Sequence, residues 1–140
     1  LVYSRLCRAA WWAKQGLPYI ATNPDWVCPT DAETVLVDCG SLQKCIEAAT
    51  GRKPDKVMGK PDPTMLDGIR DRHGLKPEEI AMVGDRIYTD IEMGRRAGAV
   101  SVLVLSGETT LETALEAGTA DFIVRDLKEL GDLILESRKA

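Results

Sequence analysis

The stretch from Ile80 to Asp90 reads IAMVGDRIYTD and joins a run of four apolar residues to a glycine and two carboxylates. Four consecutive apolar residues are typical of a strand that is buried on both faces of a parallel sheet. In an open α/β sheet, ligands bind beyond the carboxyl ends of the strands. Gly84 and Asp85 come at that position, and Gly84 allows a sharp turn and the close approach of a ligand. The stretch therefore predicts a strand that ends at a binding site.

Apolar runs of strand length alternate with helical patterns of about ten residues from Lys53 onward, which favours a parallel, doubly wound α/β sheet. The expected strands cover residues 80–83, 100–105 and 121–124. The expected helices run from Met65 to Gly74, from Tyr88 to Ala97, from a capping box at Thr109 and Glu112 to Gly118, and from Leu127 to Ile134.

The beginning of the chain has a less regular pattern, so we expect a separate domain there. Its expected elements are a helix over 2–15, strands over 17–22 and 34–37, and a helix that Ser41 caps and Gly51 ends. We place the boundary near Arg52-Lys53-Pro54. The sequence thus predicts two domains, residues 1–52 and residues 53–140.

The composition excludes several classes of function. The chain has a net charge of −4 and an isoelectric point near 5.1, which argues against non-specific nucleic-acid binding and against a basic membrane-surface helix. No apolar run approaches the roughly 20 residues of a membrane span, and no signal peptide is visible. We therefore expect a cytoplasmic protein. The four cysteines form no CxxC pair and His73 is the single histidine, so we expect reduced thiols and no zinc site.

A second segment, Gly59-Lys60-Pro61-Asp62-Pro63, supplies a cation 25 residues before Asp85. We expect Lys60 at the end of a neighbouring element, where its ammonium group can bind phosphate oxygens. Asp85 and Asp90 would converge on the same crevice, and two carboxylates suit Mg²⁺, which takes oxygen ligands and keeps several waters. Taken singly, each piece is more often a turn or a helix start. Their order on an α/β scaffold favours a phosphate and magnesium site.

These two segments resemble the third and fourth motifs of haloacid dehalogenase-like (HAD) phosphohydrolases. Residues 21–25, ATNPD, resemble the cap domain of subfamily IIA, which includes NagD-like and p-nitrophenyl phosphate phosphatases. Residues 49–54 and 104–107 are also similar to that group. The resemblance implies the C-terminal half of a HAD-type, Rossmann-like parallel-sheet core, together with part of an α/β cap domain.

The resemblance also implies a function. Lys60 would steady the nucleophile and the transferring phosphoryl group, and Asp85 and Asp90 would be the metal residues for Mg²⁺. The substrate-binding residues would be Asn23, Asp25 and Arg86. The reaction would be hydrolysis of a phosphate monoester, a small phosphorylated metabolite, through an aspartyl-phosphate intermediate.

Two motifs of the family do not occur in this sequence: the Asp-x-Asp-Gly-Thr segment with the nucleophile, and the Ser or Thr that binds the phosphoryl group. We therefore expect a fragment that is inactive alone. The alternative is a non-catalytic remnant that binds a phosphate ligand or a partner. An incomplete sheet leaves an open edge, which predicts a homodimer or a complementing N-terminal segment.

Two other α/β classes fit the sequence less well. A dinucleotide-binding Rossmann domain is disfavoured because no GxGxxG follows an expected strand. A response-regulator receiver is disfavoured because its acidic cluster precedes its lysine, whereas Lys60 precedes Asp85 here.

Overall fold

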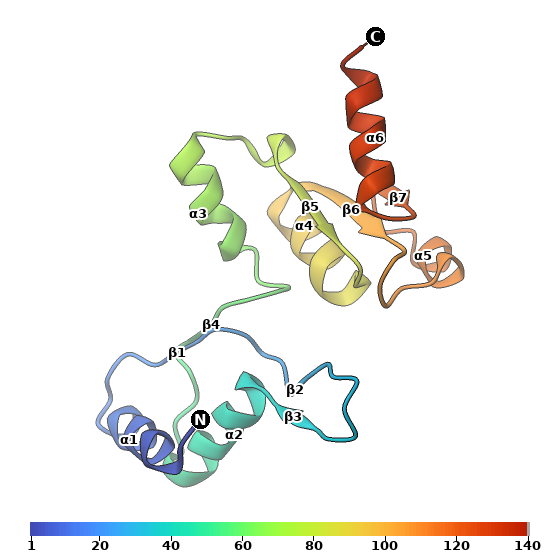
Figure 1. Cartoon of the computed structure of the whole chain (residues 1–140). Helices are drawn as coiled ribbons and strands as arrows, with labels where there is room; N and C mark the ends of the chain where they lie inside the picture. The colour runs from blue at the N-terminus through green and yellow to red at the C-terminus, as the bar shows by residue number, and fades with distance from the viewer. Residues whose placement is uncertain (140) are drawn as a thin grey trace. The chain divides into compact units, whose positions relative to one another are not determined.

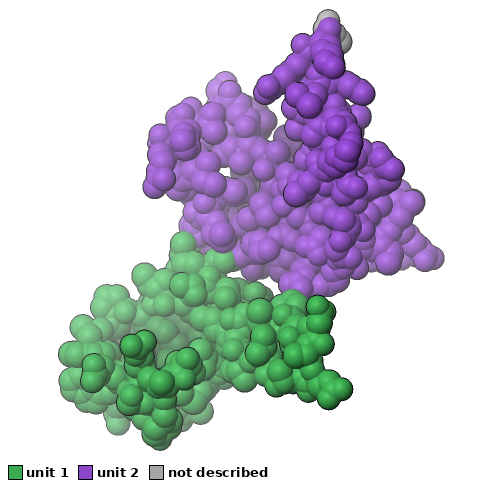
Figure 2. Space-filling model, viewed as in Figure 1, with its two compact units in different colours: residues 1–59 green, residues 60–140 purple. Residues whose placement is uncertain are grey.

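The computed structural model describes residues 1–139, which fall into two compact units, unit 1 from Leu1 to Gly59 and unit 2 from Lys60 onward (Figure 2). Residues 53–59 belong to unit 1 because a strand within them, β4 (Lys56–Val57), pairs with a strand near residue 20. Each unit is described separately below.

Unit 1 combines two helical segments with short paired strands (Figure 1). The helices that contact each other are α1 (Tyr3–Lys14) and α2 (Cys39–Thr50). The strand pairs are β1 (Ile20–Ala21) parallel with β4, and β2 (Val27–Cys28) antiparallel with β3 (Leu36–Val37). The expected helices and strands are therefore present, although the strands are shorter than the sequence predicted.

The start of α2 differs from the prediction that Ser41 caps it. Asp38 is the capping residue, because its Oδ1 accepts a hydrogen bond from the Cys39 amide at 2.6 Å. The Ser41 hydroxyl instead donates to the Trp26 carbonyl at 2.7 Å. The helix begins earlier because an aspartate is available at residue 38, and a carboxylate is an effective N-cap.

Unit 2 is built on a parallel sheet in the order β5–β6–β7, with strands Ala81–Gly84, Val100–Val104 and Phe122–Val124. Its helical segments are α3 (Thr64–His73), the 3₁₀ turn η1 (Pro77–Glu79), the π-helical turn η2 (Ile87–Ile91), α4 (Glu92–Ala97), α5 (Leu111–Ala117) and α6 (Leu127–Ser137). The predicted α/β fold with a parallel sheet is confirmed.

The central strand β6 carries the core of unit 2 on both of its faces. Leu103 is fully buried and packs with Ile91 and Ala114 on one face. Val102, the preceding residue, belongs to a cluster on the opposite face to which Leu130 of α6 contributes. Successive residues of a strand point to opposite faces. Helical segments therefore cover both sides of the sheet, as in a doubly wound fold.

Strand β5 is less buried than the sequence predicted. We expected its apolar run to be covered on both faces, but Ala81 is exposed and the following residues are half-buried. The reason is its place in the sheet, because within residues 1–139 β5 has a ladder partner on one side only, β6. The strand that is buried on both faces is β6.

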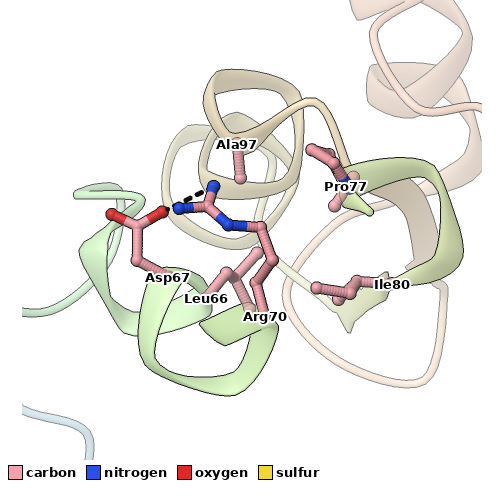
Figure 3. Close-up of a pocket in the computed structure, with 7 residues that line it drawn as sticks. Leu66, Asp67, Arg70, Pro77, Ile80 and Ala97 are labelled. Carbon is pink, nitrogen blue, oxygen red and sulfur yellow. Dashed lines mark ion pairs between the residues drawn. The ribbon is translucent and has the colours of Figure 1, made fainter. Parts of the chain in front are cut away.

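Helix α3 packs through Leu66 against Met93 and Ala99. Beside this contact, Arg70 reaches toward Asp67 and pairs with it at 3.0 Å, over a small hollow (Figure 3). The hollow holds about 10 Å³, which is room for about one water molecule and not for a substrate. Among residues 1–139, no helix combines the length and the apolar character that crossing a membrane requires.

Candidate functional site

The charged residues of unit 2 gather where β5 and β6 end. The two strands are parallel neighbours in the register Gly84 to Leu103, so their carboxyl ends lie at the same edge of the sheet. Asp85 and Arg86 follow β5 directly, and Glu108 follows β6 after a short turn. This edge is where an open α/β sheet binds its ligands.

Asp90 is the buried member of the site, with 2% of its surface exposed. Its Oδ1 forms an ion pair with Lys60 Nζ at 2.6 Å, and its Oδ2 accepts a hydrogen bond from the Arg86 amide at 3.1 Å. The Lys60 side chain is 43% exposed. The structure thus brings two predicted site residues, Lys60 and Asp90, into direct contact at the end of β5.

Two glycines make room for the carboxylates of the site. A Cβ atom on Gly84 would overlap the Asp90 side chain, and a Cβ atom on Gly107 would overlap the Asp85 side chain. The φ angle of Gly84 is not positive, so the sharp turn that we expected does not explain why this position is a glycine. The reason is the close approach of the Asp90 carboxylate to the backbone.

Asp85 joins the end of β5 to the loop that follows β6. Its Oδ2 accepts a hydrogen bond from the Glu108 amide at 2.8 Å, and its carbonyl oxygen accepts one from Thr109 Oγ1 at 2.5 Å. The sequence predicted that Thr109 caps α5, and this prediction is wrong. The capping residue is Thr110, because its Oγ1 accepts a hydrogen bond from the Thr113 amide at 3.3 Å.

Glu108 is a charged residue of the site that sequence reasoning missed. Its carboxylate accepts hydrogen bonds from Arg86 Nε at 2.6 Å and from the Tyr88 hydroxyl at 2.8 Å. The hydrogen bond to Glu108 is also the main reason that the pKa of Arg86 is raised. A carboxylate directly after Gly107, close to the end of an expected strand, was the signal that could have identified Glu108.

The other predicted substrate residues, Asn23 and Asp25, lie in unit 1 and stabilise a turn there. Asn23 Oδ1 accepts a hydrogen bond from the Asp25 amide at 3.0 Å, and the Asn23 carbonyl accepts one from Gln43 Nε2 at 2.7 Å. The Asp25 carbonyl accepts from the Gly40 amide at 2.7 Å. Both residues are half-buried. Their predicted contact with a substrate stays a prediction.

Cys39, the first residue of α2, lies next to this turn. Its Sγ is within 3.4 Å of Gln43 Nε2 and 3.8 Å of Thr22 Oγ1. Partial burial acts to raise the pKa of the Cys39 thiol, but hydrogen bonds from the Asn23 amide, Gln43 and Thr22 outweigh it and lower this pKa. All four cysteines are free thiols.

The predicted magnesium site has oxygen donors but is not a complete cage. No cluster of three or more His, Cys, Asp or Glu side chains able to hold a metal occurs within the described residues. Asp85 and Asp90 provide two carboxylates, and Thr89 Oγ1 is buried without a hydrogen-bond partner in the part of the chain that the structure describes. Mg²⁺ is commonly held by one or two carboxylates together with waters and substrate phosphates. The residues present therefore fit Mg²⁺ as a partial ligand set.

Comparison with known proteins identifies phosphatases as relatives. Residues 57–130 match the family model described as HAD-hydrolase-like. The ribonucleotide monophosphatase NagD of Escherichia coli is 39% identical over 105 residues, which are 75% of this chain and 40% of the relative. The crystal structure of the 4-nitrophenylphosphatase of Thermotoga maritima superposes with a TM-score of 0.81 at 48% identity, covering 94% of this chain and 51% of that chain.

A third relative bears on the metal. The glycerol phosphate phosphatase of Mycobacterium tuberculosis, in a crystal structure with magnesium, matches with a TM-score of 0.79 at 32% identity, covering 92% of this chain and 39% of that chain. This chain thus spans 39–51% of the length of these relatives.

Proposed function

The chain belongs to the HAD-like hydrolases, in the NagD-like subfamily IIA, and we propose that it contributes to a Mg²⁺-dependent phosphatase that hydrolyses phosphate monoesters. In this proposal unit 2 is the C-terminal half of the core and unit 1 is part of the cap. The substrate is a small phosphorylated metabolite.

The observation that carries the proposal is the ion pair between Lys60 and Asp90 at the end of β5. A buried carboxylate holds the lysine in place, while almost half of the lysine side chain remains exposed. An ammonium group fixed in this way is positioned to contact the oxygens of a phosphoryl group. Holding the cation in place before the substrate arrives reduces the reorganisation that the reaction requires.

We assign Asp85 as the direct ligand of the metal. Both carboxylate oxygens of Asp90 are engaged, by Lys60 and by the Arg86 amide, whereas the Asp85 carboxylate accepts a hydrogen bond from the Glu108 amide through Oδ2. Asp85 would hold Mg²⁺ directly, and Asp90 would act on its water shell and on Lys60. Bound Mg²⁺ neutralises charge on the phosphoryl oxygens. The magnesium complex of the Mycobacterium tuberculosis relative supports magnesium as the metal.

The nucleophile has to come from outside this sequence. The proposed reaction forms an aspartyl-phosphate on an aspartate of the first family motif, which the sequence does not contain. The chain alone is therefore inactive in this proposal. Asn23, Asp25 and Arg86 are assigned to the substrate, and in the case of Arg86 the ion pair with Glu108 fixes the guanidinium group.

A chimera tests the proposal. In it, this chain replaces the matched region of the Thermotoga maritima 4-nitrophenylphosphatase, to which it is 48% identical. We expect the chimera to hydrolyse p-nitrophenyl phosphate with Mg²⁺, and we expect metal removal by EDTA to lower the turnover at least ~100-fold. A folded chimera without phosphatase activity would contradict the proposal. If such a chimera still binds phosphate, the non-catalytic alternative is the better description.

A further inference from the structure

Glu108 is the charged residue of the strand-end site to which the proposed reaction gives no role. Its backbone and its side chain make separate contacts. The amide donates a hydrogen bond to Asp85 Oδ2 at 2.8 Å, whereas the carboxylate accepts one from Arg86 Nε at 2.6 Å. One residue of the loop after β6 therefore contacts two consecutive residues of the turn after β5.

The Glu108 carboxylate is held on both of its oxygens. Oε2 accepts from Arg86 Nε, and Oε1 accepts from the Tyr88 hydroxyl at 2.8 Å. These two hydrogen bonds fix the direction in which the carboxylate presents Oε2 to the guanidinium group. The side chains of Arg86 and Glu108 are 28% and 46% exposed, so the ion pair is in contact with solvent.

Arg86 has a second carboxylate within the range of its charge. The hydrogen bond to Glu108 is the largest cause of the raised pKa of Arg86, and the charge of Asp85 contributes to the same rise. A guanidinium group carries five N–H donors and pairs readily with carboxylates. Glu108 and Asp85 are therefore alternative partners for one cation.

The two partners have different consequences for the metal. A guanidinium group on the Asp85 carboxylate would occupy ligand oxygens and place a positive charge beside a divalent cation. We infer that Glu108 is a positioning residue: its carboxylate holds the Arg86 guanidinium group away from Asp85 and leaves the Asp85 carboxylate open to Mg²⁺. This inference rests on the proposed function, in which Asp85 is the direct ligand of the metal.

A carboxylate near a metal site also attracts a cation by its charge alone. The two explanations differ in their dependence on Arg86. If Glu108 acts by holding Arg86, loss of the Glu108 charge weakens Mg²⁺ binding only when Arg86 is present. If Glu108 acts by its charge, the loss weakens binding equally with and without Arg86. A double-mutant cycle measures this dependence.

A titration of the 140-residue chain with Mg²⁺ tests the inference without any assay of activity. The NMR signal of the Glu108 amide reports on the site, because this amide donates to Asp85 Oδ2. Glu108→Gln keeps the amide and the size of the side chain and removes its charge. We expect this variant to raise the Kd for Mg²⁺ about 3–5-fold, which is the scale of one exposed ion pair. In an Arg86→Met background, the same substitution should change the Kd less than about 1.5-fold.

Glu78→Gln is the matched control, because it also removes one exposed negative charge. Glu78 lies in η1, which precedes β5, so it is at the opposite end of that strand from Asp85. Exposed charges separated by more than about 10 Å are largely screened at 0.1 M salt. The control should therefore change the Kd less than about 1.5-fold.

Three results overturn the inference: an unchanged Kd in the folded Glu108→Gln chain, an equal rise with and without Arg86, or no response of the Glu108 amide to Mg²⁺. The proposed function is judged separately, by the turnover of the chimera. The expected pattern of Kd values together with an inactive chimera supports the inference and counts against the proposed function. An active chimera together with an unchanged Kd does the opposite.

Discussion

The strand-end site of unit 2 and the turn around Asn23 in unit 1 are both polar clusters, but they are held together differently. In unit 2 a carboxylate that is 2% exposed pairs with a lysine ammonium group. In unit 1 Asn23 makes hydrogen bonds and no ion pair: two of them join neutral amide groups, and the third, from its Nδ2 to Asp38 Oδ1, is long at 3.4 Å. A buried charge that loses its partner is costly, whereas the loss of a neutral hydrogen bond is usually worth about 1 kcal/mol. Equivalent substitutions should therefore destabilise unit 2 more than unit 1.

The glycines of the two regions differ in the same way. Gly84 leaves space for the charged side chain of Asp90, whereas Gly40 leaves space for the carbonyl groups of Pro24 and Asp25. In unit 2 the glycine makes room for a side chain of the charged site, and in unit 1 it makes room for local backbone packing.

Removing the partner of the buried charge should give the largest effect. Lys60→Met leaves Asp90 without its ion pair, and we expect the free energy of unfolding to fall by about 3 kcal/mol. The control is Lys128→Met, because Lys128 is 82% exposed and pairs with Asp132 on the surface. It should change stability by less than about 0.5 kcal/mol. Urea denaturation measures both, and similar small losses would show that the Lys60 ion pair contributes no more than a surface pair.

Filling the space beside the same carboxylate should have the next largest effect. Gly84→Ala forces the Asp90 side chain to move, and we expect a loss of about 2 kcal/mol in the free energy of unfolding. Gly68→Ala is the matched change, because a Cβ atom there meets nothing within 4 Å inside α3. Alanine should raise stability at that position by about 0.5–1 kcal/mol. Thermal or urea unfolding measures both variants. Equal effects of the two substitutions would contradict the steric explanation for Gly84.

Loss of a helix cap tests the unit 1 side of the comparison. Asp38→Ala removes the cap of α2 and should cost about 1 kcal/mol of stability. Asp31→Ala, in the exposed turn between β2 and β3, should cost less than about 0.5 kcal/mol. Chemical denaturation monitored by circular dichroism measures both. A larger loss for Asp38→Ala than for Lys60→Met would reverse the proposed order of the two regions.

The smallest effect concerns the thiol beside the Asn23 turn. Because hydrogen bonds lower the pKa of Cys39, its thiolate should form at lower pH in the unaltered chain than in the Gln43→Leu variant, which lacks one of the donors. Iodoacetamide labelling across a pH series, read by mass spectrometry, should give Cys39 a higher midpoint in the variant. Identical Cys39 midpoints in the two chains would contradict the hydrogen-bond explanation.

Local patterns in the sequence predicted much of the fold. The alternation of apolar runs and helical periods predicted the parallel sheet and the positions of its strands within a few residues. The proximity of Lys60 and Asp90 was also expected, because the sequence pattern puts both residues at strand or helix ends on one edge of the sheet.

Features that depend on contacts between distant residues were not predictable in this way. Thr109 and Thr110 are adjacent and chemically identical, so the sequence does not show which of them caps α5. The choice depends on the Asp85 carbonyl, 24 residues away, which accepts the Thr109 hydroxyl. The exposure of Ala81 likewise depends on the position of β5 in the sheet, which an apolar run does not specify.

Turnover of the chimera with an altered Asp85 is the most direct test of the proposed site. We expect Asp85→Asn to lower the Mg²⁺-dependent hydrolysis of p-nitrophenyl phosphate at least ~100-fold. Asp71→Asn provides the control, since Asp71 is 73% exposed on α3 and should leave turnover unchanged. Near-normal activity of a folded Asp85→Asn chimera would contradict the assignment of Asp85 to the metal, and with it the account of the strand-end site.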